Sequence, residues 1–131
     1  MLRRIVPIAA LAVMATAPAL AADAPKDNAK GKGQECFLTK YVEGFAAPDD
    51  KNLYIRVLGR DVYHFEMFGP CMDIDWNQRI ALVSRASDWI CDGMDAEVIS
   101  HSPIGPQHCF VRSIKKLTPD EVKALPRRAK P

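Results

Sequence analysis

The clearest pattern in the chain is a pair of alternating segments joined by a short polar loop. Apolar and polar side chains alternate along Leu53–Val57 and again along Val62–Met67, which predicts two antiparallel strands with one buried face. A two-residue loop would set an apolar face beside a polar one, whereas a three-residue loop, Gly59–Asp61, aligns the two apolar faces. The expected partners are Val57 with Tyr63, Ile55 with Phe65, and Leu53 with Met67.

The opposite face of this hairpin is polar. The same register places Arg56 opposite His64 and Tyr54 opposite Glu66. Cross-strand pairs of this kind are typical of a solvated sheet face. We therefore interpret Arg56, His64 and Glu66 as surface residues first, and as a polar site second.

Weaker patterns on both sides of the hairpin predict more short strands and turns. Strands are expected at Cys36–Val42, Ala81–Arg85, Ala96–Ile99 and Cys109–Ile114, with Cys109, Val111 and Ser113 on one face of the last. A short helix or turn with Asp73 as its cap is expected around Ile74–Ile80, and turns or loops at Asp92–Asp95 and Ser102–Pro106. Short strands at close spacing predict a mainly β (α+β) fold, a small antiparallel barrel or sandwich.

The C-terminal end carries a helix start signal. Thr118 is a suitable N-cap, Pro119 suits the first helical position, and Glu121 completes a capping box. A single short helix is expected over Pro119–Leu125, and Arg127–Pro131 is expected to fray.

The first residues have the pattern of an export signal. Arg3 and Arg4 precede an apolar run and a small-residue site, so we expect cleavage after Ala21. The run is too short for a transmembrane anchor. Residues 22–34 are polar and are expected to be a disordered tether, and residues 35–126 a single β-rich domain. The mature protein is therefore expected to be soluble, and periplasmic or secreted.

The net charge of the chain argues against one class of function, nucleic-acid binding. The whole chain has a formal net charge of +2, and this excess disappears when Arg3 and Arg4 leave with the signal. A near-neutral mature chain gives no support for nucleic-acid binding. Acidic residues gather in the middle and basic residues near the end, which we interpret as solvated faces first and as a docking dipole second.

Four cysteines in a small exported chain predict two disulfides. No Cys-x-x-Cys pair is present, which argues against a zinc site, a redox couple and haem attachment. We therefore expect no metal and no cofactor.

Three disulfide pairings are possible, and chain order gives some guidance. Cys71 follows the hairpin and Cys91 ends the next segment, so joining them closes a local loop worth about 3 kcal/mol. Cys36 opens the first strand and Cys109 the last, and these strands are neighbours if a barrel closes. The favoured pairing is Cys71–Cys91 with Cys36–Cys109, and the other two remain open.

Several short pieces of the sequence match a known family in their order. The pieces are Cys36-Phe37, Leu53–Met67, Gly69-Pro70-Cys71, Ile90–Gly93, Cys109–Val111 and Leu117–Glu121. In this arrangement the chain resembles a family of small exported bacterial four-cysteine proteins of unknown function. The resemblance spans Cys36–Leu125 and implies export and a compact domain; it implies no activity and no functional residue.

The residues themselves favour a binding or structural module over an enzyme. Asp73 and Asp75 are the best candidates for paired catalytic carboxylates of a small hydrolase, but turn-capping aspartates are far commoner, so no catalytic residue is assigned. Aromatic side chains exceed what a small core must bury, Phe68 among them. The candidate contacts with an unknown protein or small-molecule partner are Tyr54, Trp76, Trp89 and Ile104. A narrower alternative is an inhibitor of a periplasmic enzyme that uses the Ser102–Gln107 loop.

Overall fold

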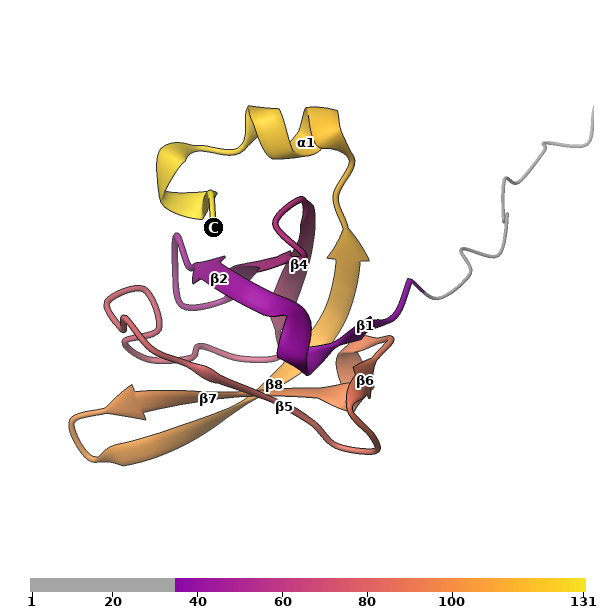
Figure 1. The fold of residues 1–131 in the computed structure, drawn as a ribbon. Helices are drawn as coiled ribbons and strands as arrows, with labels where there is room; N and C mark the ends of the chain where they lie inside the picture. The colour runs from indigo at the N-terminus through magenta and orange to yellow at the C-terminus, as the bar shows by residue number, and fades with distance from the viewer. Residues whose placement is uncertain (1–34) are drawn as a thin grey trace, which may run out of the picture.

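The computed structural model describes residues 35–131, which form a curled antiparallel half-barrel (Figure 1). The elements are β1 (Phe37–Leu38), η1 (Thr39–Tyr41), β2 (Val42–Ala46), β3 (Asn52–Val57), β4 (Asp61–Met67), β5 (Ala81–Ser84), β6 (Trp89–Ile90), η2 (Gly93–Asp95), β7 (Ala96–Ser102), β8 (Gly105–Lys116), α1 (Pro119–Ala124) and η3 (Arg127–Ala129), where η denotes a 3-10 helix. Six strands form one sheet in the order β2-β3-β4-β8-β7-β5, and β1 pairs separately with β6. The expected mainly β fold with one short helix is confirmed. The predicted signal and tether lie outside the described residues.

Strand β8 joins the two halves of the sheet. Its first half pairs with β7, and its second half pairs with β4. Between the two halves the register shifts, because Met67 faces Val111 while Glu66 faces Ser113. This arrangement leaves Arg112 as an extra residue on β8, which is a β-bulge, and bulges bend a sheet and change the direction of side chains.

The bulge corrects the predicted faces of the last strand. Val111 is buried, and the next two residues, Arg112 and Ser113, are both exposed. Ile114 then packs against the core. The sequence prediction placed Ser113 with Val111, which was wrong because strict alternation does not continue through a bulge.

The β3–β4 hairpin has the predicted buried face but a different register. Its loop is Leu58–Arg60, one residue earlier than predicted, and it begins with two residues in the left-handed region, at φ 52° and 71°. The register therefore shifts by two residues, which keeps the same side chains on the same face. The observed pairs are Val57 with Asp61, Ile55 with Tyr63, and Leu53 with Phe65.

The core lies on the concave side of the curled sheet. Phe65, Leu53, Ile55 and Ile74 are among its largest fully buried side chains. Ser100 is the buried polar residue, and its hydroxyl accepts a 2.5 Å hydrogen bond from the Asn77 side-chain amide. The segment after β4 is therefore attached to β7 through a satisfied polar contact.

One continuous strand was expected over Cys36–Val42, but the structure divides this segment between two strands. Strand β1 pairs with β6, whereas β2 pairs with β3. The chain therefore changes its pairing strand between β1 and β2, and η1 provides the change of direction. Strand β2 then continues through Gly44 to Ala46.

Both disulfides form, but the favoured pairing was wrong. The observed bonds are Cys36–Cys91 and Cys71–Cys109, in place of Cys71–Cys91 and Cys36–Cys109. The sheet is not closed by its first and last strands, which was the basis of the prediction. Instead, β1 lies beside β6, and the end of β4 lies beside β8. Each pair of neighbouring strands brings two cysteines together.

The C-terminal helix is confirmed, with its last residue at Ala124. Both hydrogen bonds of the predicted Thr118–Glu121 capping box are present. Arg127–Pro131 was expected to fray, but Arg127–Ala129 forms η3 and the Ala129 side chain is buried. The carbonyl carbon of Pro131 lies near Gly44 of β2. Within residues 35–131, no helix has the length and apolarity needed to cross a bilayer.

Candidate binding groove

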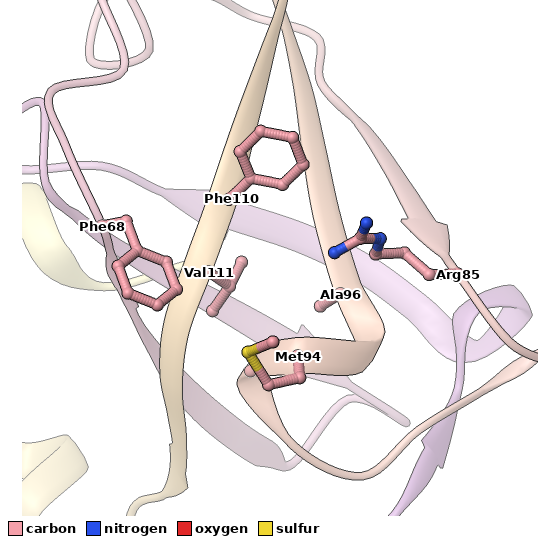
Figure 2. A pocket seen from close by; sticks show the side chains of 7 residues that line it. Phe68, Arg85, Met94, Ala96, Phe110 and Val111 are labelled. Atoms are coloured by element: carbon pink, nitrogen blue, oxygen red, sulfur yellow. The ribbon is translucent and has the colours of Figure 1, made fainter.

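A groove opens at the surface where the end of β5, η2, the start of β7 and β8 meet the chain after β4 (Figure 2). We call it the aromatic groove. Its volume is about 340 Å³. It is lined by Phe68, Arg85, Gly93, Met94, Ala96, Phe110 and Val111. Gly93, Ala96 and Val111 are buried and form its floor, and the other four side chains are exposed around it.

The two phenylalanines are fixed by the backbone. Phe110 points outward from β8, and its carbonyl oxygen accepts a 3.0 Å hydrogen bond from the Phe68 amide. Phe68 is 55% exposed and Phe110 is 48% exposed. Figure 2 shows the two rings on either side of β8. Two large apolar side chains are therefore held side by side at the surface.

Met94 completes the apolar rim and is 64% exposed. It lies in η2, whose cap is Asp92. The Asp92 carboxylate accepts hydrogen bonds from the backbone amides of Met94 and Asp95, and the Asp95 carboxylate accepts in return from the amides of Cys91 and Asp92. This reciprocal capping box fixes the backbone that carries Met94.

Each phenylalanine has an arginine over its ring. The Arg85 guanidinium lies 5.3 Å from the centre of the Phe110 ring, and the Arg112 guanidinium lies 5.4 Å from that of Phe68. Arg112 also lies 3.6 Å from a carboxylate oxygen of Glu66. Among the ion pairs of residues 35–131, none includes Arg85. Cation–π contacts of this kind orient a guanidinium and leave its edge available for hydrogen bonds.

A second cluster, polar in character, lies on the outer face of β3 and β4. Asn52 donates to both carboxylate oxygens of Asp49 at 3.0 Å, so its own side-chain oxygen faces the His64 Nε2 atom at 2.8 Å. That oxygen accepts only, so Nε2 carries the proton. The Tyr54 ring stacks on the imidazole with 4.7 Å between centroids.

Burial and hydrogen bonds together set the pKa values in this polar cluster. Burial lowers the pKa of His64 below its ordinary value and raises the pKa of Tyr54, with Asp49 adding to that rise. For Asp49, burial opposes ionisation, but hydrogen bonds from Lys51 and Asn52 outweigh it and hold the pKa below the ordinary value. Each group keeps the protonation state that its hydrogen bonds require, so the arrangement is that of a stabilising surface network.

The predicted polar set of Arg56, His64 and Glu66 is only partly brought together. The observed cross-strand pairs are Arg56 with Val62, Tyr54 with His64, and Asn52 with Glu66. Arg56 therefore does not face His64, because the hairpin register differs by two residues from the expected one. Within residues 35–131, no group of three or more His, Cys, Asp or Glu side chains could hold a metal ion.

The four predicted contact residues lie on four different elements. Tyr54 is on β3, Trp76 is in the turn after Cys71, Trp89 is on β6, and Ile104 is at the tip of the β7–β8 hairpin. Trp76 and Ile104 are 80% and 90% exposed, respectively. None of the four lines the aromatic groove.

The two candidate catalytic carboxylates are in the turn after the second cysteine. Asp73 is exposed with a left-handed φ of 60°, and its carbonyl oxygen accepts from the amides of Trp76 and Asn77. Asp75 is partly buried. The side chains that line the two cavities described here do not include either aspartate.

Sequence reasoning missed three of the four exposed residues of the groove: Arg85, Met94 and Phe110. Phe110 carried a usable signal, because it lies between two apolar residues of a strand, Cys109 and Val111, and therefore points to the other face. Arg85 and Met94 had no such signal. They reach the groove only because β5 pairs with β7 and η2 packs against β8, which no local pattern predicts.

A second cavity, of about 270 Å³, lies between the two edge strands of the half-barrel. Its lining comes from η1, β2 and the start of β5: Thr39, Val42, Glu43, Gly44, Phe45, Ile80 and Leu82. The apolar members of this lining also pack against the core. The cavity lies where the edge strands β2 and β5 do not pair, so the half-barrel remains open there.

Comparisons with known proteins identify a family for this chain. A search of curated proteins and a search of solved structures each find no significant match. The family model described as a family of unknown function, DUF6491, matches residues 1–130. Since this match covers nearly the whole chain, the protein belongs to that family of unknown function, DUF6491.

Proposed function

We propose that this protein is an exported, non-catalytic binding module that contacts a partner protein through the aromatic groove. The observation that carries the proposal is the gathering of three exposed apolar side chains, Phe68, Met94 and Phe110, around one groove with an arginine over each ring. Exposed apolar side chains are ordinary when scattered, whereas a cluster marks an interaction site.

The composition of the groove supports a protein partner. Aromatic residues, methionine and arginine are the residue types enriched at the centres of protein interfaces. Sites for small molecules enclose most of the ligand surface, whereas the rim of this groove is about half exposed. An open, aromatic and cationic surface therefore fits a partner chain better than an enclosed small ligand.

The rim is also fixed before binding. Phe68 and Phe110 are joined by a backbone hydrogen bond, and Met94 follows a capping box. Anchors that are already ordered lose less conformational entropy when a partner binds. This rigidity supports the reading of the groove as a preformed contact surface.

Two disulfides in a small domain support export to an oxidising compartment. The predicted signal sequence supports the same conclusion. The location proposed here is therefore the periplasm or the exterior of the cell.

A second candidate function rests on a separate observation. Ile104 is 90% exposed at the tip of the β7–β8 hairpin, and a protruding apolar tip suits insertion into the active-site cleft of an enzyme. This candidate is the inhibitor hypothesis, with Ile104 as its anchor in place of the groove.

Site-specific photocrosslinking separates the two candidates. A photoreactive amino acid is placed at position 94 or position 104 in the exported, full-length chain. We expect a discrete crosslinked protein from position 94, and its loss in the Phe110→Ser variant. The exposed Ile104→Ser variant is the matched control and should retain the product. No product from position 94, or a product that survives Phe110→Ser, would overturn the proposal; a product from position 104 alone would favour the inhibitor.

A further inference from the structure

We infer that the aromatic groove recognises a partner segment in which one apolar side chain is followed closely by one carboxylate side chain. The apolar side chain packs against Phe68, Met94 and Phe110, and the carboxylate binds Arg85. This inference rests on the proposed function and names the chemistry of its partner.

Arg85 is the one charged residue among the seven that line the groove. Its backbone amide is bound to the Asp95 carbonyl oxygen at 2.8 Å, which fixes the end of β5. Its guanidinium lies over the Phe110 ring, and no ion pair of the described residues includes it. A guanidinium held against a ring presents its N–H groups in the plane that a carboxylate binds with two hydrogen bonds.

The neighbouring carboxylates already have donors. Asp92 accepts from backbone amides of η2, and Asp95 accepts from the amides of Cys91 and Asp92 just before it. Glu97 pairs with His108, and Glu66 pairs with Arg112. The one charged side chain that lines the groove, Arg85, has neither a side-chain hydrogen bond nor an ion pair within residues 35–131. Charge complementarity favours an acid in the partner segment.

The same four carboxylates limit how acidic that segment can be. They are charged whether or not they accept hydrogen bonds, and like charges repel over a Debye length of about 8 Å at physiological salt. A run of acids would meet this repulsion, whereas a single carboxylate placed on Arg85 would gain a short-range contact. The inference is therefore one acid next to one apolar residue, and a polyacidic tract is excluded.

Arg112 provides a matched control for Arg85. Both guanidinium groups lie over a phenylalanine of the groove at nearly equal distances, 5.3 Å and 5.4 Å. Arg112 differs because it is paired with Glu66 and does not line the groove. Replacement of Arg112 should therefore change recognition less than replacement of Arg85.

The test uses a phage-displayed library of random 12-residue peptides, with the full exported chain as bait and the Phe110→Ser variant for counter-selection. We expect enriched peptides to carry one Asp or Glu next to a large apolar residue. Display within a coat-protein fusion leaves no free peptide C-terminus. An enriched peptide is then synthesised with blocked ends, together with its Asp→Asn or Glu→Gln counterpart.

The acidic peptide should bind about 10-fold more tightly than its amide counterpart, as expected for a charged hydrogen bond. Arg85→Gln should remove this preference, and Arg112→Gln should keep it. Enriched peptides without an acid, equal binding of both peptides, or no enrichment at all would overturn the inference. Concentration-dependent dimerisation through the groove would also overturn it. Groove-dependent binding without an acid preference would leave the proposed function standing, so the two failures are distinguishable.

Discussion

Gly93 of η2 lies so close to the backbone of Arg112 that a Cβ atom at position 93 would be 2.6 Å from the Arg112 carbonyl oxygen. Real Cβ contacts are not that short, so only glycine fits there without a shift of backbone. The contact joins η2 to the bulge of β8. It thereby holds Met94, the residue after Gly93, in a fixed position beside β8.

We predict that Gly93→Ala destabilises the domain by about 1–3 kcal/mol, because the added methyl group overpacks a backbone–backbone contact. Urea denaturation measures the change. Gly69→Ala is the matched control, since a Cβ at position 69 meets nothing within 4 Å. If the two variants have the same unfolding midpoint, then η2 does not rest on the bulge as described.

The second prediction concerns the order in which the disulfides are reduced. Cys71 and Cys109 are buried in the core, whereas Cys36 and Cys91 are partly exposed. Thiol–disulfide exchange requires access to a sulfur atom, so Cys36–Cys91 should be reduced first as reductant is increased. Alkylation followed by peptide mapping identifies the thiols that appear first.

The same mapping tests the pairing itself under non-reducing conditions. Linked peptides should contain Cys36 with Cys91 and Cys71 with Cys109. A peptide joining Cys71 to Cys91 would contradict the structure. Simultaneous appearance of all four thiols would contradict the predicted order and indicate that reduction follows global unfolding.

Local patterns in the sequence were sufficient for the buried face of the hairpin and for the start of the helix. The alternation in Leu53–Val57 predicted a buried strand face, and the Thr118–Glu121 capping box predicted the start of α1; both are present. In each case the physical cause, a two-residue period or a cap, acts within a few residues of the chain.

Relationships between distant segments could not be predicted in the same way. The disulfide pairing depends on β1 lying beside β6, and the last strand's faces depend on the bulge at Arg112. The hairpin register depends on a left-handed Leu58, a conformation that leucine rarely adopts. The groove could be predicted only from several such relationships together, because its residues come from the end of β5, η2, β7, β8 and the chain after β4.

The third prediction is a pH dependence at the start of α1. Lys115 donates a 2.5 Å hydrogen bond to Glu121, and the Thr118 amide donates another at 2.8 Å. These contacts lower the pKa of Glu121 from its ordinary value of 4.5 to about 2. A carboxyl group with a depressed folded pKa contributes stability above its unfolded pKa and loses it as pH falls.

The contribution of Glu121 should therefore be complete above about pH 4.5 and decline toward pH 2. A titration of the Glu121 side chain followed by NMR should give a midpoint near the lower value. Lys115→Gln should raise that midpoint. A wild-type midpoint near 4.5 would show that the two hydrogen bonds do not persist in solution.

The last prediction concerns His64 and its neighbours in the polar cluster. The Asn52 side-chain oxygen accepts from Nε2, so the neutral ring should have its proton on Nε2. Burial is the main cause that lowers the pKa of His64, and Lys115 also lowers it, while Glu66 and Asp49 oppose the shift. The folded state therefore resists the second proton that the unfolded chain accepts near its ordinary pKa of 6.5.

It follows that the unfolded state binds more protons than the folded state just below pH 6.5, so stability should fall as pH decreases through that region. His64→Gln keeps an amide donor for Asn52 but cannot titrate, and its stability should fall less between pH 7.5 and pH 5. Urea midpoints of both proteins at the two pH values measure the difference, and ¹⁵N chemical shifts of the ring report the tautomer. Equal pH dependence in the two proteins, or a proton on Nδ1 in the neutral ring, would contradict the hydrogen-bond chain from Asp49 through Asn52 to His64.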